Sequence, residues 1–309
     1  MDSKLRISVS PHIRSSITTT KIMLDVIIAL LPAVVAGVII FGLSALTVLV
    51  VCIAASVLSE YIFNLLAKKE QTIGDLSAVV TGLLLGLNLP ANVPLWQAAV
   101  GSVFAIIIVK CIFGGIGCNV VNPAITARVF MLVAFTSMAK AAFPVLPDAV
   151  SSATPLPEIL TGNSPSLVSL FLGNVGGAIG ETSKLALLAG GIYLISRKVI
   201  TWHIPTSFIL GVFAFSLVLE GFDFAMALSW TLSGGLILGA FFMATDYVTS
   251  PSSSKGKIIF GLGAAVITVL IRFYGNYPEG VSFAILLMNI LNPYIESWTV
   301  RKLFGGKHK

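Results

Sequence analysis

Long apolar runs separated by short polar connections dominate this sequence. Runs of this length predict membrane-spanning helices, because a bilayer core about 30 Å thick needs roughly 20 apolar residues per helix and offers backbone groups no outside partner. Their continuity favours helices over barrel strands, in which apolar and polar residues alternate. The pattern therefore predicts an all-α, polytopic membrane protein. We place about ten spans, at residues 22–42, 44–66, 75–90, 94–112, 124–139, 184–200, 205–220, 223–243, 257–274 and 280–300.

Composition agrees with this prediction. Hydrophobic residues make up 56% of the chain and charged residues 10%, whereas soluble domains carry about a quarter charged residues. The net charge of +6 raises the question of nucleic-acid binding, but the sequence has no basic stripe with interleaved aromatic residues, and its basic residues flank the apolar runs. We therefore expect membrane lipid, and no nucleic acid, among the partners.

The basic residues also predict the orientation, because cytoplasmic loops of membrane proteins carry an excess of Lys and Arg. An even number of spans places both termini on one side, and all basic residues lie on that side except Lys140, Lys184 and Arg272. We therefore predict a multi-pass protein of the cell membrane with both termini cytoplasmic. The parts outside the spans are then a retained cytoplasmic leader (1–21), an extracytoplasmic loop (140–183) and a cytoplasmic tail (301–309).

The loop divides the chain into two halves, residues 22–139 and 184–300, with five predicted helices each. An odd number of helices per half predicts an inverted repeat with broken helices. The third span ends in TGLLLGLNLP (81–90) and the eighth runs into FMATDYVTSP (242–251), so both are expected to be short or broken. Asn-Pro pairs recur in GGIGCNVVNPA (114–124) and MNILNPYIE (288–296). Alternatively, these glycines and prolines reflect only their frequency in membrane helices.

Few ionisable residues lie within the spans, where a charge costs about 2.5 to 3.5 kcal/mol on insertion scales. Asp246 stands out, because it lies with Thr245 and Thr249 in a segment expected to lose helicity before Pro251. A carboxylate beside unwound carbonyls is a common way to hold a cation or a polar ligand at membrane depth. Alternatively, Asp246 lies at the membrane interface and is solvated. We expect such a solvated position for the other acidic residues near span ends, namely Asp25, Glu60, Asp75, Glu220, Asp223 and Glu279.

Metal-binding and soluble catalytic patterns are not found in the sequence. No histidine pair has metal-ligand spacing, and Cys52, Cys111 and Cys118 are expected to be buried thiols, since an iron-sulfur cluster usually needs four cysteine ligands. The glycines of GNVGGAIGE (173–181) follow no predicted strand, so a nucleotide-binding loop is not indicated. We therefore assign no catalytic residue and no metal site.

The predicted extracytoplasmic loop contains a polar segment, DAVSSATPLPEIL (148–160), with a cluster of hydroxyl side chains. Its prolines keep the backbone extended and accessible. From residue types alone, this segment is an ordinary serine- and proline-rich turn.

Several stretches resemble one family, which comprises the D subunit of the Rnf complex and its relative, the B subunit of the sodium-translocating NADH:quinone oxidoreductase. The length and the short N-terminal leader are closer to the Rnf subunit. The resemblance implies two inverted five-helix bundles with a urea-channel-like architecture in the prokaryotic inner membrane. The stretches that carry it are SPHIRSSITTTKIMLDVIIALLPA (10–33), SAVVTGLLLGLNLP (77–90), FGGIGCNVVNPA (113–124), DAVSSATPL (148–156), GAFFMATDYVTSP (239–251) and IRFYGNYPEGVSFAILLMNILNP (271–293).

The resemblance also implies a covalent cofactor. In this family the phosphate of flavin mononucleotide (FMN) is esterified to a threonine in an S-x-A-T motif on the extracytoplasmic side, and the matching residue here is Thr154. Ser151, Ser152 and Ala153 complete the motif and leave room for the phosphate, and Asp148 matches an acidic residue common in it. A separate flavin transferase makes the attachment, with flavin adenine dinucleotide as donor and magnesium. Riboflavin at a subunit interface is a further expectation, without assigned residues.

The implied function is electron transfer within an ion-translocating ferredoxin:NAD oxidoreductase, together with the A, B, C, E and G subunits of the Rnf complex. Because the flavin carries the electron chemistry, the chain supplies its position and is not catalytic alone. We hypothesise that flavin reduction changes the packing of the two halves, and thereby the access of Na+ or H+ to a cation site near Asn88 or Asp246. A redox-inactive channel or secondary transporter of the urea-channel type is the alternative, and a redox-silent scaffold is a third hypothesis.

Overall fold

The computed structural model describes residues 17–135, 156, 159, 166–275 and 279–299, and these form helices joined by turns. The predicted all-α architecture is confirmed for this part of the chain. The first half contains α1 (Thr19–Phe41), α2 (Leu43–Leu66), η1 (Ile73–Asp75), α3 (Ser77–Leu87), α4 (Leu95–Val103), its π-helical continuation η2 (Phe104–Cys111) and α5 (Pro123–Ala134). Then follow α7 (Leu167–Leu172), α8 (Lys184–Ser196), α9 (His203–Leu219), α10 (Phe224–Leu232), α11 (Leu236–Leu238), π-helical η4 (Gly239–Met243), α12 (Ser254–Tyr274) and α13 (Val281–Thr299).

Full-length and short apolar helices are mixed in this structure. Among the described residues, α1, α2 and α12 are long and apolar enough to cross a membrane alone. The α10 helix and the α11–η4 unit meet the same requirement as a pair, with a bend of 64° between them. Five other helical units are apolar but shorter, namely α3, α4–η2, α5, α8 and α9. The protein is therefore a polytopic membrane protein with several incomplete spans.

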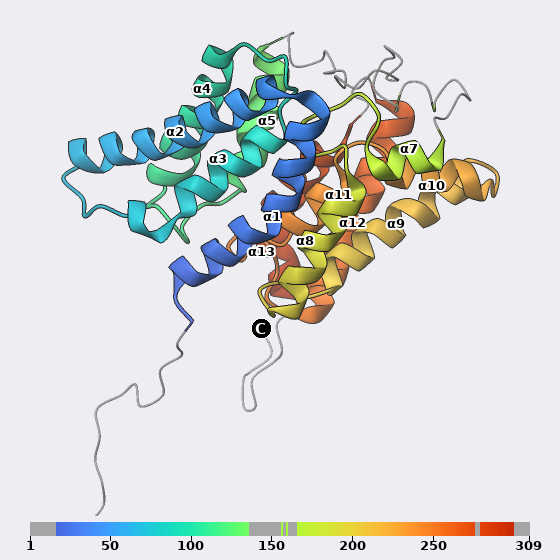
Figure 1. Ribbon diagram of the computed structural model, residues 1–309. Helices are drawn as coiled ribbons and strands as arrows, with labels where there is room; N and C mark the ends of the chain where they lie inside the picture. The colour runs from blue at the N-terminus through green and yellow to red at the C-terminus, as the bar shows by residue number, and fades with distance from the viewer. Residues whose placement is uncertain (1–16, 136–155, 157–158, 160–165, 276–278, 300–309) are drawn as a thin grey trace, which may run out of the picture.

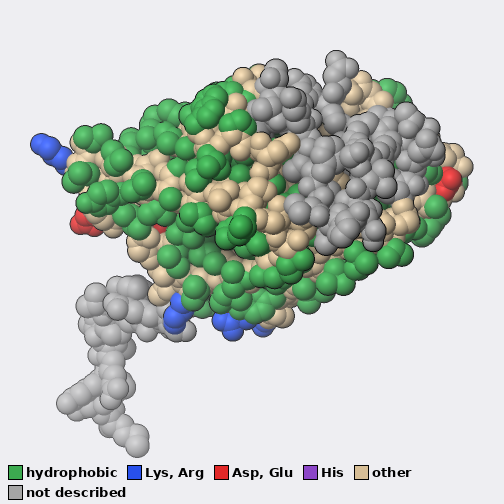
Figure 2. Space-filling model, turned by 45° about the horizontal axis from the view of Figure 1, so that its top comes forward, with side chains coloured by type: hydrophobic (Ala, Val, Ile, Leu, Met, Phe, Trp, Pro, Cys, Tyr) green, Lys and Arg blue, Asp and Glu red, His purple; other side chains and the backbone are tan. Residues whose placement is uncertain are grey.

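Large apolar side chains cover much of the outer surface. Leu43 and Leu66, at the two ends of α2, are 77% and 78% exposed, and Ile39 of α1 is 67% exposed. Figure 2 shows hydrophobic side chains over most of the described surface on one face, with Lys and Arg side chains near its edges. An apolar surface of this extent is expected where lipid surrounds a protein.

The α3 helix is short because its sequence runs into Leu89 and Pro90. Its 11 residues make a helix about 17 Å long, roughly half of the hydrocarbon core. At the end of the helix and just after it, the carbonyls of Leu87 and Leu89 accept backbone hydrogen bonds from Gly180 (2.7 Å) and Ile179 (3.0 Å). A distant non-helical segment therefore satisfies the open end of α3, and the predicted break is confirmed.

The eighth predicted span, residues 223–243, is interrupted once and is followed by a non-helical segment. The α10 helix ends at Leu232, and a turn at residues 233–235 separates it from α11 and η4. Gly234 has a φ of 64° in this turn, a backbone conformation that glycine adopts without steric cost. Helical structure then ends at Met243, and residues 244–253 are non-helical. The expected loss of helicity before Pro251 is confirmed, whereas the earlier break at 233–235 was not expected.

The two halves lie side by side, with α2 to α5 toward the left and α7, α9 and α10 toward the right of Figure 1. They contact each other along α1 and α8 and along α5 and α13. Within the first half α2 packs against α3 and α4, and within the second half α9 packs against α10 and α12. The order of packing partners is therefore the same in both halves. Their inverted orientation and their boundaries stay predictions.

Glycines permit a close approach of α8 to α1 and to η4. Gly190 in the middle of α8 lies so close to the carbonyl oxygen of Ala29 in α1 that a Cβ atom at residue 190 would overlap it. At the neighbouring Gly191, a Cβ atom would overlap the ring of Phe241 in η4. The two central helices therefore contact each other backbone to backbone.

Candidate functional site

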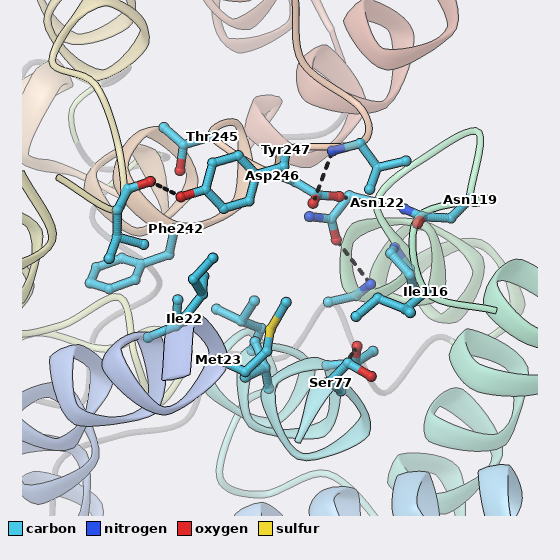
Figure 3. A pocket seen from close by; sticks show the side chains of 18 of the residues that line it. Ile22, Met23, Ser77, Ile116, Asn119, Asn122, Phe242, Thr245, Asp246 and Tyr247 are labelled. Carbon is cyan, nitrogen blue, oxygen red and sulfur yellow. Dashed lines mark hydrogen bonds between the residues drawn. The ribbon is translucent and has the colours of Figure 1, made fainter. Parts of the chain in front are cut away.

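A cavity of about 280 Å³ lies where the first turns of α1 and α3 meet the segment that follows η4. This is the end of the molecule that the sequence predicts to be cytoplasmic. In Figure 3, Phe242, Ile22 and Met23 lie on the left and lower sides of the cavity, Asn119 and Asn122 lie on the right beside the apolar Ile116, and Thr245 and Asp246 lie above. Ser77 lies at the bottom, so apolar and polar side chains both line the cavity.

The half-buried Asp246 is positioned by the unwound segment after η4. Its carboxylate accepts hydrogen bonds from the hydroxyl of Thr249 (3.2 Å) and the backbone N–H of Val248 (3.5 Å), while its carbonyl accepts from the hydroxyl of Ser250 (2.6 Å). Thr245 donates back to the carbonyl of Phe241 in η4 (2.7 Å). These local bonds replace the helical ladder, so Thr245, Asp246 and Thr249 are brought together as expected.

The two Asn-Pro segments meet beside this carboxylate. The amide of Asn119 donates to Asp246 (3.4 Å), and the side-chain oxygen of Asn122 caps α5 by accepting from the N–H groups of Ala124 (3.0 Å) and Ile125 (3.3 Å). When the amide nitrogen of Asn289 faces Thr249, it donates to the Thr249 carbonyl (3.2 Å), and the Asn289 side-chain oxygen accepts from the N–H of Asn122 (3.1 Å). The repeated asparagines were noted in the sequence, but their contact with the Asp246 segment was not predicted.

Met243 joins Asn88 to this site. The Asn88 amide donates to the carbonyl of Leu84 (2.8 Å) and to the sulfur of Met243 (3.2 Å), and the Asn122 amide donates to the carbonyl of Met243 (3.2 Å). Asn88 is buried and does not line the cavity. Its side-chain oxygen instead accepts from Arg128. Met243 was not predicted from the sequence as a site residue, although its position at the end of a broken helix could have indicated one.

A buried ion pair borders the cavity on the α3 side, which corrects one expectation. Glu60 was expected to be solvated, but it lies buried in α2, and the ammonium of Lys110 contacts its carboxylate at 2.8 Å. Lys110 also donates to the hydroxyl of Ser77 (2.6 Å), and the second Glu60 oxygen accepts from the hydroxyl of Thr72 (2.6 Å). Packing of α2 against η2 removes both charges from solvent, and these partners compensate for the loss of water.

The cavity is lined by apolar side chains together with hydroxyl, amide and carboxylate groups, so it offers a ligand both apolar contact and hydrogen bonds. For a cation, Asp246 supplies the single carboxylate among the described lining residues, with amide and hydroxyl oxygens beside it. In the described part of the chain, no three His, Cys, Asp or Glu side chains gather to hold a metal ion. The proposed flavin residues, Asp148, Ser151, Ser152, Ala153 and Thr154, lie outside the described residues.

The chain matches the model of the family described as NQR2, RnfD, RnfE over residues 6–305. It belongs to this family. The matched range contains every residue of the cavity and the Thr154 segment. The resemblance inferred from sequence motifs is therefore confirmed.

The chain is similar along its whole length to three proteins with related names. The D subunit of the Na(+)-translocating ferredoxin:NAD(+) oxidoreductase complex of Acetobacterium woodii is 49% identical, with 97% of this chain and 95% of that protein covered. The D subunit of the proton-translocating ferredoxin:NAD(+) oxidoreductase complex of Clostridium ljungdahlii is 42% identical, with 97% and 96% covered. The D subunit of the ion-translocating oxidoreductase complex of Marinobacter nauticus is 37% identical, with 96% and 94% covered. The first name specifies Na+, the second specifies the proton and the third specifies no particular ion, so family membership alone does not identify the transported ion.

Proposed function

We propose that this chain is the D subunit of an ion-translocating ferredoxin:NAD oxidoreductase in the prokaryotic cell membrane, working with the A, B, C, E and G subunits. The observation that carries the proposal is the 49% identity over 97% of the chain to the D subunit of such a complex. The lipid-facing apolar surface and the broken helices support a role inside the membrane. The basic-residue asymmetry supports cytoplasmic termini and an extracytoplasmic Thr154 loop.

Thr154 carries FMN through a phosphodiester in this proposal, attached by a flavin transferase. When bound, the isoalloxazine supplies the electron-accepting chemistry. The chain's own contribution is to hold that ring in place. Leu156 and Ile159, which follow Thr154 by two and five residues, are buried against Trp230. The attachment segment is thus anchored to the second half at its C-terminal end.

Fluorescence of the denatured chain tests the attachment. The full chain, co-expressed with a flavin transferase, is expected to give an ultraviolet-fluorescent band in a denaturing gel. Thr154→Ala should abolish the band, whereas Ser152→Ala, at the variable position of the motif, should retain it. A band that persists in Thr154→Ala would refute the attachment site. The absence of a band in the unaltered chain would favour a transporter or scaffold instead.

Thr245, Asp246 and Thr249, with Asn88 linked to them through Met243, form the proposed ion pathway of the same protein. Support comes from the geometry, because the Asp246 carboxylate lies among hydroxyl and amide groups and Met243 links this segment to Asn88. Asp246→Asn and Asn88→Ala should each lower Na+ or H+ uptake by vesicles that contain the complex, at an unchanged rate of flavin reduction. Coupling that is intact in both variants would remove the hypothesis.

Riboflavin at a subunit interface is the remaining cofactor proposal, and we propose the cavity as the place in this chain to test for it. Ile22→Trp would fill the cavity, because Ile22 lines it. Leu24→Trp is the matched control, since Leu24 is 47% exposed on the outer side of α1. Flavin released on denaturation should fall in the first variant and not in the second. An equal flavin content in both would remove the cavity as the site.

A further inference from the structure

Charged side chains gather in the core around the turn that ends α10, and none of them lines the cavity. Arg128 contacts the carboxylates of Glu181 (2.7 Å) and Glu279, and Lys184 and Arg272 complete this charged cluster. Glu279 was expected to be solvated. That expectation is wrong, because its side chain is 18% exposed and pairs with Arg128. Arg128, which was counted among the cytoplasmic basic residues, is buried as well.

Arg272 is a permanent cation at the end of α10. It donates to the carbonyls of Trp230 (2.6 Å), Ser233 (3.0 Å) and Glu279 (3.2 Å). Cations are favoured at the C-terminal end of a helix, where the carbonyls carry partial negative charge. A guanidinium does not lose its proton in proteins, so the positive charge of Arg272 is constant.

The Nζ atom of Lys184 has only neutral acceptors. Lys184 begins α8 and is 2% exposed. Its Nζ atom donates to the backbone carbonyls of Glu181 and Gly234 (2.9 Å), and no ion pair among the described residues includes it. An ammonium carries three N–H donors, whereas a neutral amine carries two. Within the described residues, the two carbonyls therefore satisfy a neutral amine completely and leave one donor of an ammonium without an acceptor.

The charge of the cluster also favours a neutral Lys184. The two guanidinium groups, Arg128 and Arg272, balance the two carboxylates, Glu181 and Glu279. A charged Lys184 would add one positive charge without a partner among the described residues, and such a charge is costly in a low-dielectric interior. Lysine can release its proton when it is buried, whereas arginine cannot. Hydrogen bonding and charge balance therefore agree.

The elements around α8 supply no further charge near Lys184 within the described residues. The α7, α11 and η4 helices pack against α8 and contain no ionisable side chain. Asp25 of α1 contacts the opposite end of α8, where it accepts from the hydroxyl of Tyr193 (3.0 Å). The charged groups that face Lys184 are therefore the other members of the cluster, which come from α5, α12 and the segments before α8 and α13.

We propose that Lys184 is a proton-binding site, whose side chain is a neutral amine in the folded protein. Folding releases one proton from the ammonium of the unfolded chain to water, and a proton taken up by the folded chain binds the lone pair of the same nitrogen. Such uptake adds a positive charge beside the break between α10 and α11. A proton needs no cavity, and the site depends neither on the proposed flavin nor on the proposed ion pathway.

The pH dependence of unfolding tests this site. As long as Lys184 is neutral in the folded chain, the unfolded chain binds one proton more, so the unfolding constant falls about tenfold for each unit of increasing pH. Lys184→Gln keeps a neutral NH2 donor and removes the titration. Unfolding of the full chain would be measured in mixed detergent micelles by tryptophan fluorescence. The unfolding constant of Lys184→Gln, divided by that of the unaltered chain, should rise about tenfold per unit between about pH 7 and about pH 9.

Lys257→Gln is the matched control, because the Lys257 ammonium donates to Thr201 (3.2 Å) in an exposed position. The same quotient for this variant should not change with pH. A constant quotient for Lys184→Gln would overturn the proposal. A second readout needs no substituted chain to fold: nitrogen-15 NMR of the unaltered chain, labelled at lysine Nζ, should show one amine resonance apart from the ammonium resonances at neutral pH. Ammonium resonances alone would likewise overturn the proposal.

Discussion

Removal of Lys110 from the buried pair with Glu60 is expected to destabilise the protein strongly. In Lys110→Met, the apolar stem of the side chain is kept and the ammonium is lost. Glu60 then keeps its hydrogen bond from Thr72 but loses its cation, in a position where the glutamate side chain is 2% exposed. Breaking a buried ion pair from one side costs about 3–5 kcal/mol, because a charge is left in the interior without compensation.

The double variant Glu60→Gln/Lys110→Met should recover most of this loss. It removes both charges, and replacement of a buried pair by neutral side chains is often close to neutral in stability. The free energy of unfolding would be measured in mixed detergent micelles by tryptophan fluorescence. Comparison of both single variants with the double variant then gives the coupling energy of the pair.

Arg197→Met is the matched control. Arg197 pairs with Asp25 at 3.4 Å, but its side chain is 58% exposed, and exposed pairs contribute only about 0–1 kcal/mol. If Lys110→Met cost no more than Arg197→Met, or if the double variant were no more stable than Lys110→Met, the reasoning about a desolvated pair would be refuted.

Two further predictions concern the contact between the halves and the cap of α5. Gly190→Ala should lower the free energy of unfolding by about 1–3 kcal/mol, because its methyl group would overlap the Ala29 carbonyl. Gly74→Ala is the control in the same unfolding assay, since a methyl group there meets no atom within 4 Å. Equal stability of the two variants would contradict the close contact. Asn122→Ala should lower the free energy of unfolding by about 0.5–2 kcal/mol, because the cap of α5 is lost. Asn174→Ala is the control, since Asn174 is exposed. If both variants had the same midpoint of thermal unfolding in detergent, the cap would not stabilise α5.

The positions of the helices and of two breaks could be predicted from sequence because each depends on local features. Apolar length determines the spans. Leu89-Pro90 lies directly after the end of α3 at Leu87, and Pro251 lies in the non-helical segment that follows Met243. The break at 233–235 has no proline. There, the turn conformation of Gly234 and the side chains of Lys184 and Arg272 from other elements stabilise the interruption.

The buried charges could not be predicted, because pairing depends on which elements pack together. Glu60 and Lys110 are 50 residues apart in the sequence, and Arg128 reaches a glutamate 151 residues away. A count of basic residues by side of the membrane treats all of them as loop residues. Two of the three exceptions to the predicted asymmetry, Lys184 and Arg272, are in fact buried in the core. Lys110 and Arg128, which the count placed on the cytoplasmic side, are buried as well, so the rule for loops applies to none of these four residues.

The backbone contact between Ala29 and Gly190 has a mechanical consequence. It lies near the middle of both α1 and α8, so the two helices cannot approach further there. Leu194, near the C-terminal end of α8, lines the Asp246 cavity, and Lys184, at its N-terminal end, donates to the break between α10 and α11. A side chain at residue 190 would therefore push the halves apart midway between these two sites.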